Sequence, residues 1–173
     1  MNTFALDIWD DEASRCTFYT VRWEDSDTNE TDKFFNKFES NTKYKKESQV
    51  LVSFLLDAIG ENHGAKLLFF NRPENEVAGL PPKGRIQVGE IAFSFPDFPL
   101  RLYALRITNE LVILFNGGIK DGPTNQKSSL HFVWKEACAF AQRIDEALQE
   151  GILIIDHQNR RITYEDDNNE IYL

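Results

Sequence analysis

The sequence contains no apolar stretch close to the roughly 20 residues that a membrane-spanning helix needs, so we expect no membrane partner. The N-terminus, MNTFALDIWDDEASR, also lacks the basic-then-apolar pattern of a secretion signal, and we therefore expect a cytoplasmic protein. Only two cysteines are present, Cys16 and Cys138, and neither belongs to a C-x-x-C pair. We expect both to be reduced thiols with a structural role.

Positive charge is scarce, with 19 Lys and Arg against 28 Asp and Glu and a net charge of −9. This balance argues against a nonspecific nucleic-acid binder. The charge is uneven, however, because residues 1–40 hold 4 basic and 10 acidic side chains, whereas residues 41–120 hold 10 basic and 8 acidic. The slightly positive middle of the chain fits either a solvated mixed surface or a local site for an anion.

Metal and hydrolase motifs are missing as well. The segment DSDTNETD (25–32) begins like a calcium loop, but Glu30 stands at the sixth position, where such a loop needs glycine. None of the three histidines has a partner at the spacing of metal ligands, and no serine lies in a G-x-S-x-G turn. We therefore expect no metal and no cofactor.

The 42% hydrophobic content of the 173 residues is enough for a packed core, and we expect one domain over residues 1–173. Residue periodicity and turn signals predict the following elements: a strand at 16–23, helices at 33–40 and from 45 to a stop at Gly60, a strand at 85–95, a hairpin at 99–120, a helix at 128–151 and a hairpin at 152–165. This order predicts an α+β fold: an N-terminal strand and helical hairpin, an antiparallel sheet with a long helix packed on it, and a C-terminal β-hairpin.

The most informative segment is PLRLYALRITNELVILFNGGIKDG, residues 99–122. A two-residue turn after Thr108 would place Arg101 opposite Gly118. Alternation along the strands then puts Arg101, Tyr103 and Lys120 on one face of the sheet. Arg101 and Lys120 become diagonal neighbours about 7–8 Å apart, with open space beside Gly118.

Two such cations on one concave sheet face suit a phosphate, because Arg offers a planar fork of donors and Lys a mobile charge. An alternative is that they are edge charges that keep the sheet soluble. The pairing is also conditional, because a one-residue slip would scatter the cluster over both faces. A three-residue loop at Thr108–Glu110 would cause such a slip.

The stretch LRLYALRITNELVILFNGGIKDG, followed by a helix with alanines, resembles the core of the RelE/HigB-like toxins of toxin–antitoxin systems. The resemblance covers about residues 16–150 in the order of elements and 99–141 in residue pattern, which leaves 152–173 as an appended hairpin and acidic tail. It implies a small α+β protein that binds messenger RNA on the ribosome and is partnered by a cognate antitoxin. It also implies metal-independent cleavage, in which the RNA 2′-hydroxyl attacks the neighbouring phosphate.

The resemblance implies that Arg101 and Lys120 are catalytic residues that stabilise charge on the phosphate. Tyr103, the third catalytic residue that the resemblance implies, falls at an aromatic position and would stack on a base. Further cations would hold the RNA backbone: Lys83, Arg85 and Arg106. The chain departs from the family where Asp121 replaces a second lysine, and in its negative net charge. A non-catalytic protein-interaction domain of related fold, or a small-molecule enzyme using the same cationic notch, remain alternatives.

Overall fold

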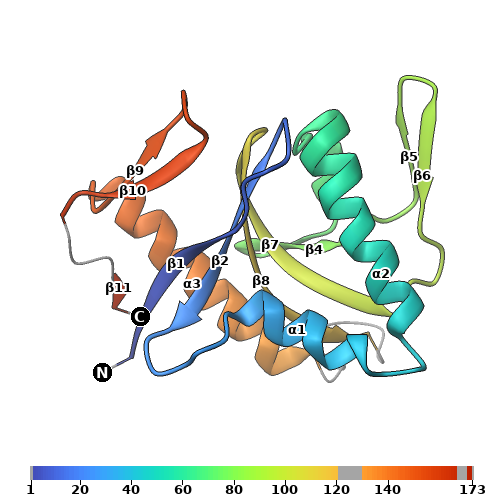
Figure 1. Ribbon diagram of the computed structural model, residues 1–173, viewed down its shortest axis with the longest axis horizontal. Coiled ribbons are helices and arrows are strands. Elements are labelled where there is room, and N and C mark those ends of the chain that lie inside the picture. The colour runs from blue at the N-terminus through green and yellow to red at the C-terminus, as the bar shows by residue number, and fades with distance from the viewer. Residues whose placement is uncertain (1, 121–129, 167–170, 173) are drawn as a thin grey trace.

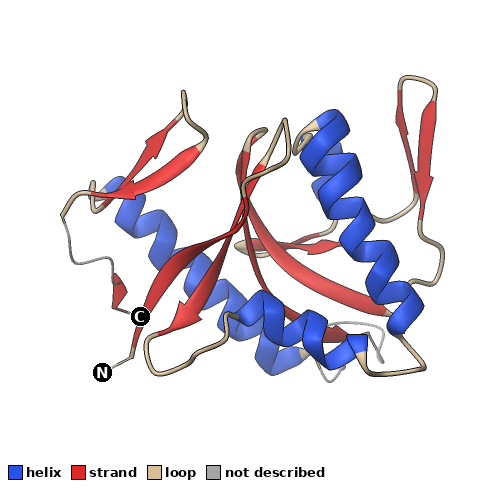
Figure 2. Cartoon of the chain, viewed as in Figure 1, coloured by secondary structure: helices blue, strands red, loops and turns tan. Residues whose placement is uncertain are grey.

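Strands and helices are mixed along the chain in the computed structural model, which describes residues 2–120, 130–166 and 171–172 (Figures 1 and 2). The N-terminal part contains β1 (Thr3–Asp10), β2 (Thr17–Trp23), α1 (Glu30–Glu39), α2 (Lys45–Ser53), the π-helical continuation η1 (Phe54–His63) and the 3-10 helix η2 (Leu67–Phe70). The remainder contains β3 (Pro73–Glu74), β4 (Val77–Leu80), β5 (Arg85–Val88), β6 (Ile91–Ser94), β7 (Leu100–Thr108), β8 (Leu111–Ile119), α3 (His131–Gln149), β9 (Leu153–Asp156), β10 (Arg161–Tyr164) and β11 (Ile171–Tyr172). The predicted α+β class is confirmed.

Seven of the described strands form one sheet in the order β11-β1-β2-β8-β7-β4-β3. Every neighbouring pair is antiparallel except β2 and β8, which run parallel with Thr17 opposite Leu111. The sheet is therefore mixed, because the chain crosses over through the helices before it returns to the side of β2. The sequence prediction also missed β1, whose residues 3–10 pair with β2.

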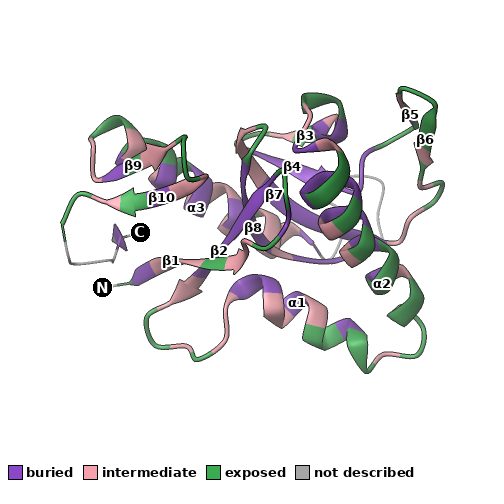
Figure 3. Cartoon of the chain, turned by 45° about the horizontal axis from the view of Figure 1, so that its top comes forward, coloured by how far each residue is buried: buried purple, intermediate pink, exposed green. Residues whose placement is uncertain are grey.

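Each face of the sheet carries its own apolar core. The helices α1, α2 and η1 cover one face, where they pack on side chains of β7 and β8 such as Leu102 and Leu114. The other face lies under α3, where the Phe140 ring centroid is 4.9 Å from that of Phe4 and 5.9 Å from that of Phe115. The central strands are consequently buried on both sides (Figure 3). Side chains of residues 100–104 in β7 and 111–115 in β8 are therefore buried whichever way they point.

The helical hairpin begins at a side-chain cap and ends later than predicted. Asn29 caps α1, and its Oδ1 accepts a hydrogen bond from the Asp32 amide at 2.8 Å. The second helix does not stop at Gly60, where a Cβ would lie 3.0 Å from the Cβ of Ala13. Gly60 is thus a point of close approach, and the helix ends at Gly64, whose φ of +77° favours glycine.

Two hairpins lie outside the main sheet. The prediction of a single strand at 85–95 was wrong: the segment turns at Gly89 and forms two strands, β5 and β6, which pair with each other as a separate two-stranded arm (Figure 1). The predicted C-terminal hairpin, β9–β10, is fastened to the first strands, since Tyr164 Oη accepts from the Leu6 amide and Tyr19 Oη from the Ile162 amide, both at 2.9 Å. After it, Ile171 pairs with Phe4 of β1. No helix in the described part has both the length and the apolar content that a membrane crossing requires.

Candidate anion-binding site

The β7–β8 hairpin has the predicted turn and the predicted pairing at both ends. Thr108 pairs with Leu111 beside the turn, and Arg101 pairs with Gly118 at the far end. Between these points two irregularities shift the register by one residue and back. Phe115 consequently packs in the core under α3, whereas uninterrupted pairing would place it on the opposite face. Simple alternation from the turn, which would put Phe115 on the same face as Ala104, therefore fails in the central part of β8.

Two glycines shape the end of this hairpin. A Cβ on Gly117 would lie 1.9 Å from the carbonyl oxygen of Arg101, so the strands can approach this closely only at glycine. A Cβ on Gly118 would lie 2.9 Å from Cδ2 of Leu130, the residue directly before α3. The predicted open space beside Gly118 is therefore absent, because the Leu130 side chain occupies it.

Arg101 is largely enclosed on the face covered by α3. Arg101 is only 8% exposed, and its Nη1 donates to the carbonyl oxygens of Phe98 and Leu100 at 2.8 and 2.9 Å. Burial and the positive charge of Arg72 lower the pKa of Arg101 below its usual value. The predicted cation is present, but it is held by backbone carbonyls beneath the surface.

Tyr103, the second predicted catalytic residue on this face, has 0% exposure. Burial raises the pKa of its hydroxyl, and so do the negative charge of Glu74 and a hydrogen bond to it. A side chain with no accessible surface cannot stack on a base in this arrangement, contrary to the expectation for Tyr103. Its contact with Glu74 instead makes it a positioning residue for that carboxylate.

Arg72 and Glu74, which the sequence analysis did not single out, complete the cluster around Arg101. All three side chains meet over Gly79 of β4: a Cβ there would lie 3.1 Å from Arg72 Cδ, 3.6 Å from Arg101 Cδ and 3.7 Å from Glu74 Oε2. Gly79 pairs with Tyr103, which places the hydroxyl-bearing ring beside them. We call Arg72, Glu74, Arg101 and Tyr103 the arginine cluster.

The arginine cluster has more positive than negative charge. Among the described residues, neither Arg72 nor Arg101 has a carboxylate oxygen within 4.0 Å of a guanidinium nitrogen. Arg72 Nε donates to the Pro81 carbonyl at 3.3 Å, and burial lowers the pKa of Arg72. Glu74 Oε2 is buried and has no hydrogen-bond partner in the described part of the chain. Two partly buried guanidinium groups therefore have one carboxylate, that of Glu74, as their nearby negative charge, and neither forms an ion pair with it.

The first turns of α3 border this cluster. Trp134 Nε1 donates to the Glu74 carbonyl oxygen at 3.0 Å, and Cys138 Sγ lies 3.7 Å from the same oxygen. The ring of His131 lies 6.0 Å from that of Trp134, and its Nδ1 is buried without a partner among the described residues. Trp134 is half-buried, so this ring contacts the cluster and still retains exposed surface.

Of the other predicted residues, Lys120 is placed beside Arg101 by the strand pairing, whereas Arg106 is not. Lys120 follows β8, and its amide donates to the Pro99 carbonyl at 2.7 Å, which extends the pairing next to Arg101. Arg106 alternates to the opposite face of β7, where Nε donates to the Ala65 carbonyl at 2.6 Å. Lys83 and Arg85 are exposed, one in the loop after β4 and one on the β5–β6 arm. Arg106 thus lies on the opposite face of the sheet from the arginine cluster, whereas the backbone of Lys83 is hydrogen-bonded to Asn71, the neighbour of Arg72.

A second titratable pair lies between α1 and α3. Glu30 is buried. Its Oε2 forms an ion pair with Lys33 Nζ at 2.7 Å, and its Oε1 accepts a hydrogen bond from Asn116 Nδ2 at 3.5 Å. Burial, then the negative charge of Glu30 and a hydrogen bond with it, raise the pKa of Glu136 to about 7. Within the described ranges no group of three or more His, Cys, Asp or Glu is arranged to hold a metal ion.

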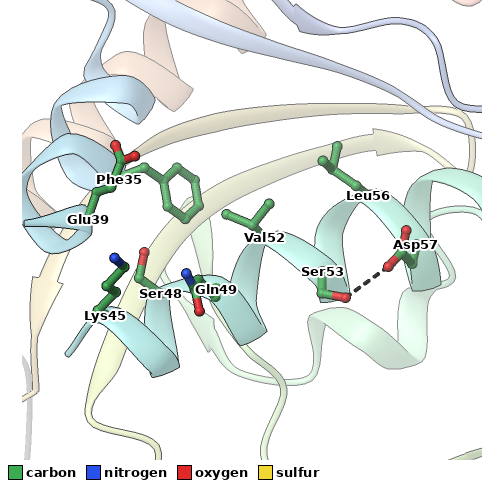
Figure 4. Close-up of a pocket in the computed structure, with 9 residues that line it drawn as sticks. All are labelled: Phe35, Glu39, Lys45, Ser48, Gln49, Val52, Ser53, Leu56 and Asp57. Atoms are coloured by element: carbon green, nitrogen blue, oxygen red, sulfur yellow. Dashed lines mark hydrogen bonds between the residues drawn. The ribbon is translucent and has the colours of Figure 1, made fainter.

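The chain also has a groove on the other side of the sheet, between α1 and α2. This cavity of about 470 Å³ is walled by apolar side chains of Phe35, Val52 and Leu56 (Figure 4). Polar groups surround them, and Ser53 Oγ donates to Asp57 Oδ2 at 2.8 Å. The groove shares no residue with the arginine cluster.

Comparisons of the chain with models of known protein families, with curated proteins and with solved structures find no match.

Proposed function

We propose that the chain is a toxin-like RNA-binding protein of the toxin–antitoxin kind, in which Arg72 and Arg101 together hold an RNA phosphate. One observation carries this proposal: the side chains of Arg72 and Arg101 meet over Gly79, close enough for the charge of Arg72 to lower the pKa of Arg101, and neither guanidinium has a carboxylate within 4.0 Å among the described residues. Buried charges in proteins are normally paired, so an anion from outside would complete the cluster. The order of strand, two helices, strands and long helix agrees with the order that the resemblance implies.

The phosphate would approach from the β3 edge of the sheet. Arg72 is half-buried, and the next residue, Pro73, is exposed at this edge. Arg101 lies deeper, where its guanidinium is already oriented by two carbonyl oxygens. A fixed donor behind a more accessible one suits electrostatic stabilisation, because the charges need little reorganisation when the anion arrives.

The same cluster contains the groups that an endoribonuclease reaction needs. The RNA 2′-oxygen would form a bond to phosphorus while the bond from phosphorus to the 5′-oxygen breaks. Glu74 Oε2, which is buried and has no hydrogen-bond partner among the described residues, would accept the 2′-hydroxyl proton, and the departing 5′-oxygen would take a proton from water. Arg72 and Arg101 would stabilise the negative charge on the phosphoryl oxygens. Lys120 is proposed as a further cation of this site.

The test is binding of fluorescein-labelled single-stranded RNA, measured by anisotropy. Arg72→Ala is expected to weaken binding about tenfold, as loss of a phosphate contact does. Arg15→Ala is the matched control, because Arg15 is an exposed arginine in the loop between β1 and β2. Equal affinities of the two variants would refute the assignment of the phosphate to the arginine cluster.

Cleavage is tested separately from binding. Glu74→Gln is expected to abolish RNA cleavage and growth arrest on expression while RNA affinity stays within about threefold of wild type. A wild-type protein that binds RNA but does not cleave it would reduce the function to RNA binding. A Glu74→Gln variant that still cleaves would remove Glu74 as the base.

A non-catalytic protein-interaction domain is the second candidate, and the groove between α1 and α2 favours it. An apolar groove with polar rims is typical of surfaces that accept a peptide or helix. This function would be preferred if the wild-type protein neither binds RNA nor slows growth. Val52→Glu would then be the variant that abolishes partner binding.

A further inference from the structure

The 3-10 helix η2 presents two leucines to solvent. Leu67 is 70% exposed and Leu68 is 40% exposed. The two residues that follow are buried, and the Phe69 ring centroid lies 5.4 Å from that of Phe54 in the core under α2. The phenylalanines therefore anchor the short helix and leave the leucines at the surface.

The segment before η2 is held to the β7–β8 turn. The Ala65 amide donates to the Asn109 carbonyl at 2.7 Å, and Arg106 Nε donates to the Ala65 carbonyl at 2.6 Å. The close approach also needs Gly64, where a Cβ would lie 3.1 Å from the Asn109 carbonyl oxygen. The leucines are thus presented by a fixed segment, and little conformational freedom is lost when something binds them.

The charges around these leucines are of one sign. A shallow depression of about 700 Å³ is bordered by the residues that we call the leucine patch: Lys66, Leu67, Leu68, Phe70, Asn71, Pro73, Arg106 and Asn109. Its charged members are Lys66 and Arg106, and no carboxylate is among the described residues that border it. The whole chain, by contrast, has a net charge of −9. The patch is therefore a basic, apolar area on an acidic protein.

We infer that the leucine patch docks an acidic, apolar segment of a partner protein. Apolar side chains of such a segment would cover Leu67 and Leu68, and its carboxylates would face Lys66 and Arg106. A second copy of this acidic chain fits less well, because two molecules of like charge repel. This inference goes beyond the proposed RNA function and does not depend on it.

The test is selection of random peptides displayed on phage against the immobilised full-length protein. Peptides that combine Leu, Ile or Phe with Asp or Glu are expected to be enriched. Their affinity, measured with the synthetic peptides, is expected to fall about tenfold or more in Leu67→Glu, because a buried leucine contact is lost. Ile154→Glu is the matched control, because Ile154 is 49% exposed on β9, outside the patch.

Several outcomes would overturn the inference. These are no enrichment, enrichment of basic peptides, or equal loss of affinity in Leu67→Glu and Ile154→Glu. Binding of phosphatidylserine vesicles that Leu67→Glu abolishes would assign the patch to a membrane surface. A dimer in sedimentation that Leu67→Glu dissociates would assign it to a second copy. Loss of RNA binding in Leu67→Glu would make the patch part of the RNA surface. The proposed RNA function is tested separately, because it fails if Arg72→Ala binds RNA as tightly as Arg15→Ala.

Discussion

The two glycines at the end of β8 should respond very differently to the same substitution. In Gly117→Ala the new Cβ would lie 1.9 Å from the Arg101 carbonyl oxygen and 2.9 Å from Leu102 Cα. Ordinary van der Waals contact begins near 3.4 Å, whereas the Cβ would lie 1.9 Å from the carbonyl oxygen. The strands must therefore separate by about 1.5 Å, the difference between 3.4 and 1.9 Å. The obstacle is backbone, which cannot rotate away as a side chain can. Gly117→Ala must therefore disrupt the pairing of β7 with β8 at this end of the hairpin.

We expect Gly117→Ala to lower the free energy of unfolding by about 3 kcal/mol or more, at the upper end of overpacking effects. In Gly118→Ala the nearest atom, at 2.9 Å, is the far end of the Leu130 side chain, which can move. Its cost should be about 1 kcal/mol or less, partly offset by the lower entropy of the unfolded chain.

Urea unfolding followed by tryptophan fluorescence measures both free energies. The expected difference in melting temperature between the variants is on the order of 5 °C or more for a chain of this size. A Gly117→Ala protein within about 0.5 kcal/mol of wild type would refute the packing described for the hairpin, as would a larger loss in Gly118→Ala.

Three further predictions concern stability. The pKa of Glu136 is raised from 4.5 to about 7 in the folded protein, which therefore holds a proton that the unfolded chain has released. The urea concentration at the unfolding midpoint should consequently decrease as the pH is raised from about 5 to about 7.5. Glu136→Gln should make this decrease smaller. Tyr103→Phe removes the hydroxyl that contacts Glu74 and should cost about 1–3 kcal/mol in urea unfolding, with an unchanged value counting against that contact. Asn29→Ala removes the cap of α1 and should cost about 1 kcal/mol. Asp7→Asn breaks the half-exposed pair with Arg22 and should cost less, about 0.5 kcal/mol. Thermal unfolding that reverses this order would refute both assignments.

Local signals in the sequence were sufficient for the three long helices and the two hairpins β7–β8 and β9–β10, but not for four of the seven strands in the main sheet: β1, β3, β4 and β11. The turn after Thr108 sets the register of β7 and β8 at both ends, because a two-residue connection leaves a single pairing. The long helix α3 was visible from its apolar periodicity. The parallel contact between β2 and β8 was not, because strand direction depends on where the intervening elements pack. The register shift beside Gly117 could not be predicted from the sequence either. A glycine indicates that two strands approach closely, but it does not indicate which strand is displaced.

The composition of the candidate site was harder to foresee for a related reason. Arg72 and Glu74 lie in a segment whose prolines and glycines predict a loop. They reach Arg101 only because β4 pairs with β7 and brings Gly79 opposite Tyr103. An arginine beside a proline looks like an ordinary surface cation until that pairing is known. The signal that was available is Gly79 itself, a glycine within an otherwise apolar strand, which often marks the close approach of another group.

The salt dependence of RNA binding separates a localised site from a general basic surface. A chain with a net charge of −9 repels RNA at long range, so any affinity must come from local contacts. Each phosphate contact with a single strand contributes a slope of about −0.7 to the logarithm of affinity against the logarithm of salt concentration. Two arginines that hold one or two phosphates therefore predict a slope between about −0.7 and −1.4. A slope several times steeper would mean that many cations hold the RNA rather than the two arginines of the cluster. The salt slope thus tests whether the arginine cluster accounts for binding, independently of any substitution that disturbs its packing.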